Sequence, residues 1–152
     1  MSKKDWGNIS WILMHSLAQK VTENNFINCK QILIKIIFDI CNNLPCPDCR
    51  EHANKLLKTS NIIKISNKKQ LISFLWEFHN IINRKLKKPT KNIEEVEKHY
   101  STAKLNMIVS TFFRVYNSVI YNEKMLADSF RRKIFLKKLL EDLVKLKPYL
   151  NH

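Results

Sequence analysis

The chain of 152 residues contains a single glycine, Gly7. Antiparallel sheets need tight turns at short intervals, and glycine adopts the backbone conformations of those turns most readily. The scarcity of glycine therefore disfavours a β-rich fold. It also excludes glycine-rich nucleotide loops, because both G-x-G-x-x-G and the P-loop require more than one glycine. Any phosphate group bound by this chain must be held by side chains or helix ends.

Apolar residues recur every three to four positions along most of the chain, which is the spacing of one helix face. This pattern predicts helices over residues 8–21, 28–43, 68–87 and 94–121, a shorter helix from Cys46 to about Lys58, and a last helix from about Glu123 to Lys147. A loop is expected over 61–67. The sequence thus predicts an all-α fold of five or six helices, and its 45% hydrophobic residues suffice for a core.

The periodicity also predicts which side chains face inward. His15 lies on the inward face of the first helix, together with Trp11, Met14, Ala18 and Val21. The helix over 68–87 is expected to bury Leu71, Phe74, Leu75, Phe78, Ile82 and Leu86. The fifth helix carries Leu105, Val109, Phe112, Tyr116 and Val119 at the same spacing. On the last helix, a seam formed by Leu136, Leu139, Leu143, Leu146 and Leu150 is expected to pack on the bundle or on a partner.

A C-x-x-C pair is formed by Cys46 and Cys49. Pro47 suits the first position of a helix, which places Cys46 at the N-cap. There the unpaired N–H groups and the helix dipole favour a thiolate, and Arg50 adds positive charge. A dithiol at a helix start indicates redox chemistry, although the thioredoxin version of this motif belongs to a βαβ fold and no strands are predicted here.

The two other cysteines, Cys29 and Cys41, lie 12 residues apart on one predicted helix. That spacing corresponds to about 18 Å along a helix axis. The Cα atoms of a disulfide lie within about 7 Å, so these two cannot pair with each other. They are interpreted as buried small apolar residues.

A zinc site is the competing interpretation of the C-x-x-C pair. Cys46, Cys49 and His52 could supply three ligands, with His15 or His79 as the fourth. A structural zinc site normally draws a second compact pair of ligands, and the sequence offers none. A bound metal is therefore disfavoured.

The formal net charge is +14, from 27 Lys and Arg against 13 Asp and Glu. A net charge of this size is typical of proteins that bind nucleic acids. The lysines are spread over several predicted helices, however, and no familiar nucleic-acid-binding motif is present. A basic surface exposed to solvent is therefore favoured over a nucleic-acid-binding site. No apolar run is long enough to span a membrane, and residues 1–6 lack the apolar core of a signal peptide. A reducing, cytoplasmic location is therefore expected, in which four cysteines favour redox catalysis or metal over structural disulfides.

A second polar constellation occupies the end of the helix over 68–87. His79 and Asn83 are four residues apart and share one helix face, with Asn80 and Lys87 beside them. This stripe borders the apolar face, an arrangement that suits a large planar ligand with a polar tail. On its own, this stripe is more typical of the boundary of an ordinary amphipathic helix.

Three motifs occur in order within 90 residues: Trp11-x3-His15-x2-Ala18, Pro-Cys-Pro-Asp-Cys, and His-Asn-x-x-Asn-Arg-Lys-Leu-x-Lys-Pro. In combination they resemble the Erv/ALR family of FAD-dependent sulfhydryl oxidases. The context from Leu44 to Ala53 is most similar to the versions carried by large cytoplasmic DNA viruses. The resemblance covers residues 6 to about 100. It implies a four-helix bundle binding FAD over residues 1–118, with an additional C-terminal helical extension over 119–152.

The resemblance implies roles for individual residues. Cys46 and Cys49 are the expected catalytic pair, with Cys46 exchanging with substrate and Cys49 nearer the flavin. The expected cofactor-binding residues are Gly7, Trp11, His15, His79, Asn80, Asn83, Lys87 and Lys88, and Tyr100 falls near a family aromatic position. No metal-binding residue is expected.

The resemblance also implies an activity and partners. Electrons would pass from a substrate dithiol through Cys46 and Cys49 to FAD and then to O2, giving H2O2. Because no second C-x-x-C pair is present, a thioredoxin-like or C-x-x-C protein is the expected direct donor. A homodimer through the first two helices is implied, with the seam from Leu136 to Leu150 as another possible surface. If the source is viral, the host cytoplasm or the virion is the expected location. A zinc-stabilised module and a basic nucleic-acid binder remain the alternatives without catalysis.

Overall fold

The computed structural model describes residues 3–118 and 126–151, and within these ranges the protein is built from α-helices without a β-strand. This confirms the all-α prediction. The helices are α1 (Lys3–Lys20), α2 (Phe26–Asn42), α3 (Pro47–Thr59), α4 (Lys68–Lys85), α5 (Ile93–Ser101), α6 (Leu105–Asn117) and α7 (Leu126–Leu146). Short 3-10 turns occupy Glu23–Asn25, Ile62–Lys64 and Lys147–Tyr149.

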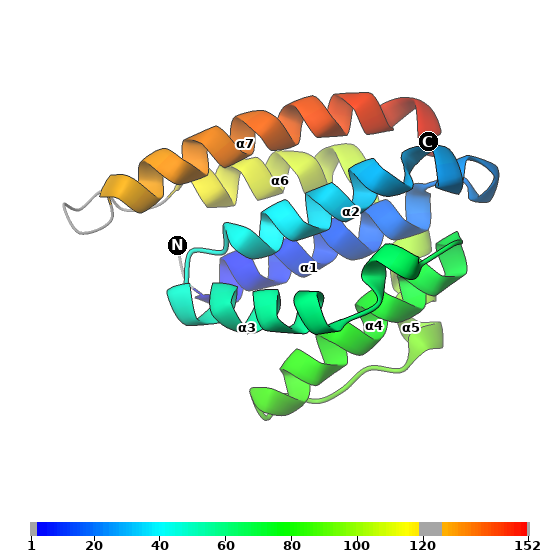
Figure 1. Ribbon diagram of the computed structural model, residues 1–152, viewed down its shortest axis with the longest axis horizontal. Coiled ribbons are helices and arrows are strands. Elements are labelled where there is room, and N and C mark those ends of the chain that lie inside the picture. The colour runs from blue at the N-terminus through cyan, green and yellow to red at the C-terminus, as the bar shows by residue number, and fades with distance from the viewer. Residues whose placement is uncertain (1–2, 119–125, 152) are drawn as a thin grey trace.

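The helices α1 and α2 form the middle of the molecule (Figure 1). On one side of this pair lie α3, α4 and α5, and on the other side α6 and α7 run along the bundle. Helix α1 contacts α4, α5 and α6, whereas α2 contacts α3 and α7. The C-terminal helices therefore cover faces of α1 and α2 within the same chain.

A single apolar core joins both sides of the molecule. Its fully buried members include Leu13 on α1, Ile36 on α2, Leu75 on α4, Phe112 on α6 and Leu139 on α7. The seam predicted on the last helix faces this core, with Leu136, Leu139 and Leu146 buried and Leu143 and Leu150 half-buried. The chain end is also fastened to the bundle, because the Asn151 amide donates to the Lys20 carbonyl at 2.7 Å.

Asparagine side chains begin two of the helices. The Asn67 carboxamide oxygen accepts a hydrogen bond from the Gln70 amide at the start of α4, and Asn92 accepts one from the Glu95 amide at the start of α5. Each bond satisfies one of the amides that a first helical turn leaves without a partner. The entry points of these two helices are thus fixed by local sequence.

The continuous helix predicted over 94–121 is wrong, because the structure divides it into α5 and α6 at residues 102–104. The hydroxyl groups of Ser101 and Thr102 donate to the carbonyls of Lys98 and His99. Such local bonds compete with the helix ladder and favour an end at this point. The break allows both α5 and α6 to pack on α1. Val119, the end of that predicted helix and the predicted start near Glu123 lie outside the described residues.

Leu86 was predicted to face inward, but 43% of its surface is exposed. Helix α4 ends at Lys85, so Leu86 no longer follows the helical periodicity. Lys87 then adopts a left-handed backbone conformation with φ of 57°, which turns the chain away from the helix axis. The apolar pattern extended one residue further than the helix.

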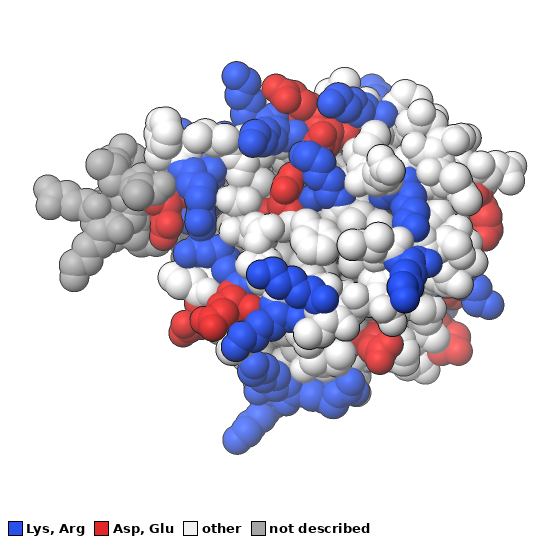
Figure 2. Space-filling model, in the orientation of Figure 1, with Lys and Arg blue, Asp and Glu red and all other residues white. Residues whose placement is uncertain are grey.

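Lys and Arg side chains are spread over the face shown in Figure 2, with acidic residues between them, and do not form one continuous stripe. On this face, the distribution favours a solvated basic surface over a nucleic-acid groove. Among the described helices, none combines the length and the hydropathy that crossing a membrane requires.

Candidate active site

Cys46 occupies the N-cap of α3, as the sequence predicted, with Pro47 in the first turn. Its backbone is extended (φ −101°, ψ 120°), and its Sγ accepts a hydrogen bond from the Cys49 amide at 3.3 Å. The Cys46 carbonyl accepts the first helical bond, from the Arg50 amide at 3.0 Å. Both cysteines are partly exposed. The sulfur of Cys46 therefore lies at the N-terminus of a helix, in contact with a backbone amide and partly exposed to a reagent.

Arg50 holds the turn that leads into the cysteine pair. Its Nη1 donates to the Leu44 carbonyl at 2.7 Å, and its Nη2 lies 4.0 Å from a carboxylate oxygen of Asp128 on α7. Only 15% of the Arg50 side chain is exposed. This arginine thus connects the start of α3 to the C-terminal helix.

Cys29 and Cys41 lie in the core, on α2. Burial raises the pKa of the Cys29 thiol, and it raises the pKa of Cys41 to about 12. Both residues therefore remain protonated at neutral pH. The prediction that these two cysteines are buried apolar residues is confirmed.

Four of the aromatic and histidine side chains named from the sequence form one cluster, in which Trp11 and His15 from α1 meet His79 from α4 and Tyr100 from α5. The rings of Trp11 and His79 are stacked, with centroids 4.0 Å apart and planes 6° from parallel. His15 stacks on Tyr100 at 4.9 Å. A hydrogen bond of 3.0 Å joins His15 Nε2 to His79 Nδ1. Residues 64 positions apart in the chain therefore meet in one cluster of stacked and hydrogen-bonded rings.

The two clustered histidines are held in the neutral form. Burial lowers the pKa of His15 to about 3, with further contributions from His79 and the positive charge of Lys91. Burial also lowers the pKa of His79 to about 4, assisted by Lys91 and Lys88. In the neutral form one nitrogen of each ring donates a hydrogen bond and the other accepts one. The pair can therefore bind a neutral heteroaromatic ring without adding charge.

Asn80 fastens the segment that follows α4. Its carboxamide donates to the Lys91 carbonyl at 2.8 Å and accepts from the Lys91 amide at 2.9 Å. The Trp76 indole donates to the same carbonyl at 2.6 Å. The sequence pattern suggested Asn80 as a ligand contact but gave no indication of this bond to Lys91. The structure thus gives Asn80 a role in positioning residues 86–91.

The remaining residues predicted to bind a cofactor lie around this cluster. Asn83 is buried one turn after His79, and its carbonyl accepts from the Lys88 amide at 2.8 Å. The side chains of Lys87 and Lys88 are exposed at the end of α4. Gly7 lies in α1, where an added Cβ would meet no atom within 4 Å, so neither the backbone nor the packing requires glycine there.

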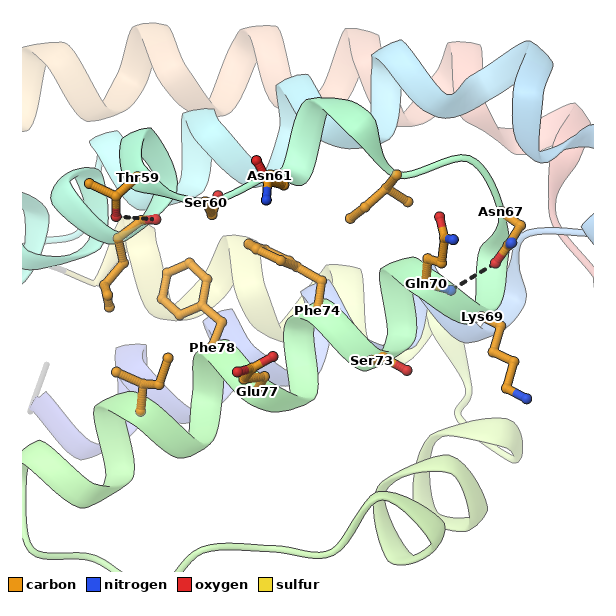
Figure 3. Close-up of a pocket in the computed structure, with 13 residues that line it drawn as sticks. Thr59, Ser60, Asn61, Asn67, Lys69, Gln70, Ser73, Phe74, Glu77 and Phe78 are labelled. Atoms are coloured by element: carbon orange, nitrogen blue, oxygen red, sulfur yellow. Dashed lines mark hydrogen bonds between the residues drawn. The ribbon is translucent and has the colours of Figure 1, made fainter.

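A pocket of about 740 Å³ opens between α3 and α4. The rings of Phe74 and Phe78 on α4 point toward Ser60 and Asn61, which follow α3 (Figure 3). Phe78 also meets Trp11 edge-on, with centroids 5.2 Å apart, so this apolar pocket adjoins the aromatic and histidine cluster. The sequence pattern named Phe74 and Phe78 only as apolar residues. It missed the pocket because Ser60 and Asn61 lie in a segment without periodicity.

No group of three or more His, Cys, Asp or Glu side chains that could hold a metal ion occurs in the described ranges. His15 and His79, each proposed as a fourth zinc ligand beside Cys46, Cys49 and His52, are instead bonded to one another. The geometry therefore favours the redox interpretation of the cysteine pair over the zinc interpretation.

Together these features define an all-helical protein with a dithiol at a helix N-terminus and a separate cluster of stacked rings. The sequence of the chain matches the model of the Erv1 / Alr family over residues 8–101, a region that contains the cysteine pair and the whole ring cluster. The chain belongs to this family.

Curated relatives agree with this assignment. The chain is 30% identical over 98 residues to a protein of Invertebrate iridescent virus 3 that carries the name of a FAD-linked sulfhydryl oxidase; the match covers 64% of this chain and 66% of the relative. It is 29% identical over 103 residues to the FAD-linked sulfhydryl oxidase of African swine fever virus; the match covers 68% of this chain and 86% of the relative. It is 26% identical over 89 residues to the FAD-linked sulfhydryl oxidase of rice; the match covers 59% of this chain and 45% of the relative.

The chain thus spans less than two thirds of the length of several curated relatives, including those of the iridescent virus and of rice. The family match ends before α6 and α7. No solved structure matches the chain significantly.

Proposed function

We propose that this protein is a FAD-linked sulfhydryl oxidase that forms disulfides in partner proteins. The observation that carries the proposal is the position of Cys46 at the N-cap of α3, with Cys49 in the first turn, inside the region matched by the family. The dithiol would accept electrons from substrate thiols, and the bound flavin would remove them. The catalytic part would comprise residues 1–118, with 119–152 as a C-terminal extension.

The residues around the ring cluster fit FAD. Trp11, His15, His79 and Tyr100 supply aromatic rings and neutral histidine nitrogens, a composition that suits contacts with a heteroaromatic ring system. The adjoining pocket, at about 740 Å³, has the size of cofactor sites. Lys87 and Lys88 supply positive charge for phosphate groups, which a chain with one glycine cannot hold in a glycine-rich loop. Asn83 completes the proposed set, with Asn80 acting through the Lys91 bond.

The chemistry of the cysteine pair begins from its disulfide form. A substrate thiolate attacks Cys46 Sγ, the Cys46–Cys49 bond breaks, and Cys49 leaves as a thiolate. A second substrate thiolate then attacks the substrate sulfur of this mixed disulfide and releases Cys46. The substrate is oxidised by two electrons, which now reside on the two cysteines, and its two protons pass to solvent. Bound FAD would supply the acceptor for these two electrons and their route to O2, with H2O2 as the product.

The structure suggests how each element supports this exchange. The Cys49 amide and the first turn of α3 stabilise a thiolate on Cys46 as it leaves the mixed disulfide. Arg50 adds positive charge and holds the preceding turn in place. The neutral histidines allow hydrogen bonding to the flavin without placing a permanent charge against it. We propose a thioredoxin-like or C-x-x-C protein as the electron donor, in a reducing compartment such as the cytoplasm.

The proposal is tested by the visible spectrum of the protein purified with FAD and by oxygen consumption in the presence of a dithiol. A yellow protein that consumes O2 and forms H2O2 supports it. The matched variants are His79→Ala, which should lose bound FAD, and His52→Ala, an exposed histidine on α3 that should retain it. A colourless wild-type protein, or one whose flavin binding is unchanged in His79→Ala, would contradict the proposed site.

A further inference from the structure

Asp128 lies in the first turn of α7 and connects that helix to the end of α3 that carries the two cysteines. One of its carboxylate oxygens is 4.0 Å from Nη2 of Arg50 on α3, and the other is 3.9 Å from Nη2 of Arg131 on α7. The first turns of α3 and α7 lie at the same end of the molecule (Figure 1). Helix α7 lies outside the region matched by the family, so the family match does not account for this contact.

Arg50 bonds the chain at two points around the cysteine motif. Its Nη1 donates to the Leu44 carbonyl at 2.7 Å, two residues before Cys46, and its backbone amide donates to the Cys46 carbonyl at 3.0 Å. The position of Arg50 therefore affects the turn over residues 44–46. Because the guanidinium group is planar and rigid, a carboxylate on the Nη2 side also orients Nη1. Asp128 supplies that carboxylate, and it thereby supports the bond to Leu44.

Asp128 also has a structural role, which involves Arg132. This arginine lies four residues further along α7 and on the same helix face. It is 3% exposed, and its Nη2 is buried without a hydrogen-bond partner among residues 3–118 and 126–151. Burial lowers the pKa of this guanidinium, and the negative charge of Asp128 opposes that shift. A buried cation without an opposite charge nearby is unfavourable, so Asp128 also contributes to the stability of the fold.

We propose that Asp128 is a positioning residue for the Cys46–Cys49 pair, acting through Arg50 on the turn that presents Cys46 to the substrate. The inference rests on the thiol exchange proposed above. With the carboxylate in place, the Arg50 guanidinium remains on the Leu44 carbonyl. Without it, the guanidinium can turn toward solvent, and Cys46 spends less time in the extended N-cap conformation. Helix α7 then belongs to the framework of the dithiol, although none of its groups touches the substrate.

The test is the rate at which dithiothreitol reduces the Cys46–Cys49 disulfide in full-length protein without added FAD. Asp128→Asn should lower this rate about fivefold, an effect of the size that a partly exposed ion pair can supply. Asp128→Glu retains the carboxylate and should stay within about twofold of the wild type. The matched control is Glu141→Gln, an exposed acid of the same helix, which should leave the rate unchanged. Quenching with a maleimide followed by mass spectrometry measures each rate.

A double variant tests whether Asp128 acts through Arg50. Arg50→Gln should itself slow the exchange, and the addition of Asp128→Asn to it should cause no further fall, because both changes act on the same turn. A further fivefold fall in the double variant would overturn the proposal, as would an unchanged rate in Asp128→Asn. The exchange can be measured whether or not the protein uses O2, so a failure of this inference is distinguishable from a failure of the proposed oxidase function.

A second double variant separates positioning from stability. Arg132→Met removes the buried cation and leaves the contact between Asp128 and Arg50, so its exchange rate should stay within about twofold of the wild type. Combined with Asp128→Asn, it should restore the free energy of unfolding, measured in urea, while the exchange remains about fivefold slow. Recovery of the exchange rate together with the stability would overturn the proposal, because Asp128 would then have only its structural role.

Discussion

The chain contains two pairs of cysteines in opposite environments. Cys46 and Cys49 lie on the first turn of α3, partly exposed and beside helix amides. Cys29 and Cys41 lie inside the bundle on α2, where burial raises the pKa of Cys41 to about 12. The same thiol group is thus poised for exchange at one place and kept protonated at the other. The difference comes from local hydrogen bonding and solvation, because the side chains are identical.

The largest expected effect is on turnover. Cys49→Ser should reduce thiol oxidation to the uncatalysed background, because the disulfide that receives the electrons can no longer form. Cys41→Ala should leave the rate near that of the wild type. Oxygen consumption with a dithiol substrate measures both. Substantial turnover in Cys49→Ser would show that the α3 pair is not the relay, and loss of turnover in folded Cys41→Ala would show that the buried pair takes part.

Labelling of the reduced, folded protein with iodoacetamide should separate the two environments next. At pH 8 a thiol with a pKa of about 12 is ionised roughly 1,000-fold less than an ordinary cysteine. Cys46 should therefore react first, whereas Cys41 should react only as the protein unfolds. Peptide mass spectrometry at successive times measures the labelling of each cysteine separately. Labelling in urea, where the protein is unfolded, is the control. Equal labelling rates of Cys46 and Cys41 in the folded protein would contradict the proposed difference between the two cysteine environments.

The same substitution should have unequal costs for folding. Cys41→Ser places a hydroxyl group in an apolar site and should lower the free energy of unfolding by about 1–3 kcal/mol. Cys46→Ser should change it by less than about 0.5 kcal/mol, because serine is itself a good N-cap residue. Urea denaturation of both variants measures the difference. Similar losses at the two positions would indicate that Cys46 is packed more tightly than its partial exposure implies.

The last expected effect concerns pH and extends the comparison from buried thiols to buried histidines. The unfolded chain protonates His15 and His79 near pH 6.5, whereas the folded chain protonates them only near about 3 and about 4. Their contribution to stability is therefore complete above pH 6.5 and is lost as the pH falls below it. When the pH is lowered from 7.5 to 5.5, each of the two histidines should lower the free energy of unfolding by about 1.4 kcal/mol.

Urea denaturation at the two pH values, without added FAD, measures this loss. His79→Gln should remove about half of this pH dependence, because His15 would remain as the one buried histidine of the pair. A wild-type stability that does not fall between these pH values would show that the histidines are solvated in the folded protein.

Some features of the fold could be predicted because they depend on neighbouring residues. Pro47 after Cys46 was enough to predict the N-cap, and the apolar spacing was enough to predict α1, α2 and α4. The break between α5 and α6 was missed, although the hydroxyl residues Ser101 and Thr102 mark it. The buried residues before the break are Val96 and Tyr100, and those after it are Phe112 and Tyr116. At about 100° per residue, Tyr100 and Phe112 differ by about 120° around a single helix axis, so the apolar face changes at this point and the predicted continuous helix overlooked that change.

In the candidate site, too, the sequence predicted the residues but not the contacts between helices. The sequence named His15 and His79, but not their mutual hydrogen bond or their neutral state. Those depend on α1 and α4 lying against each other, which burial of both helices against one core determines. The role of Asn80 was equally hidden, because its partner is the backbone of Lys91, and a backbone group leaves no signature in the sequence.

By itself, the sequence determined that the chain is helical, where its dithiol caps a helix, and which motifs place it in its family. These follow from side-chain chemistry and from spacings shorter than a few helical turns. Only the tertiary structure decided which of two apolar faces of α7 enters the core and which remains outside. Periodicity reports that a face is apolar, but burial depends on which other helix is near enough to cover it.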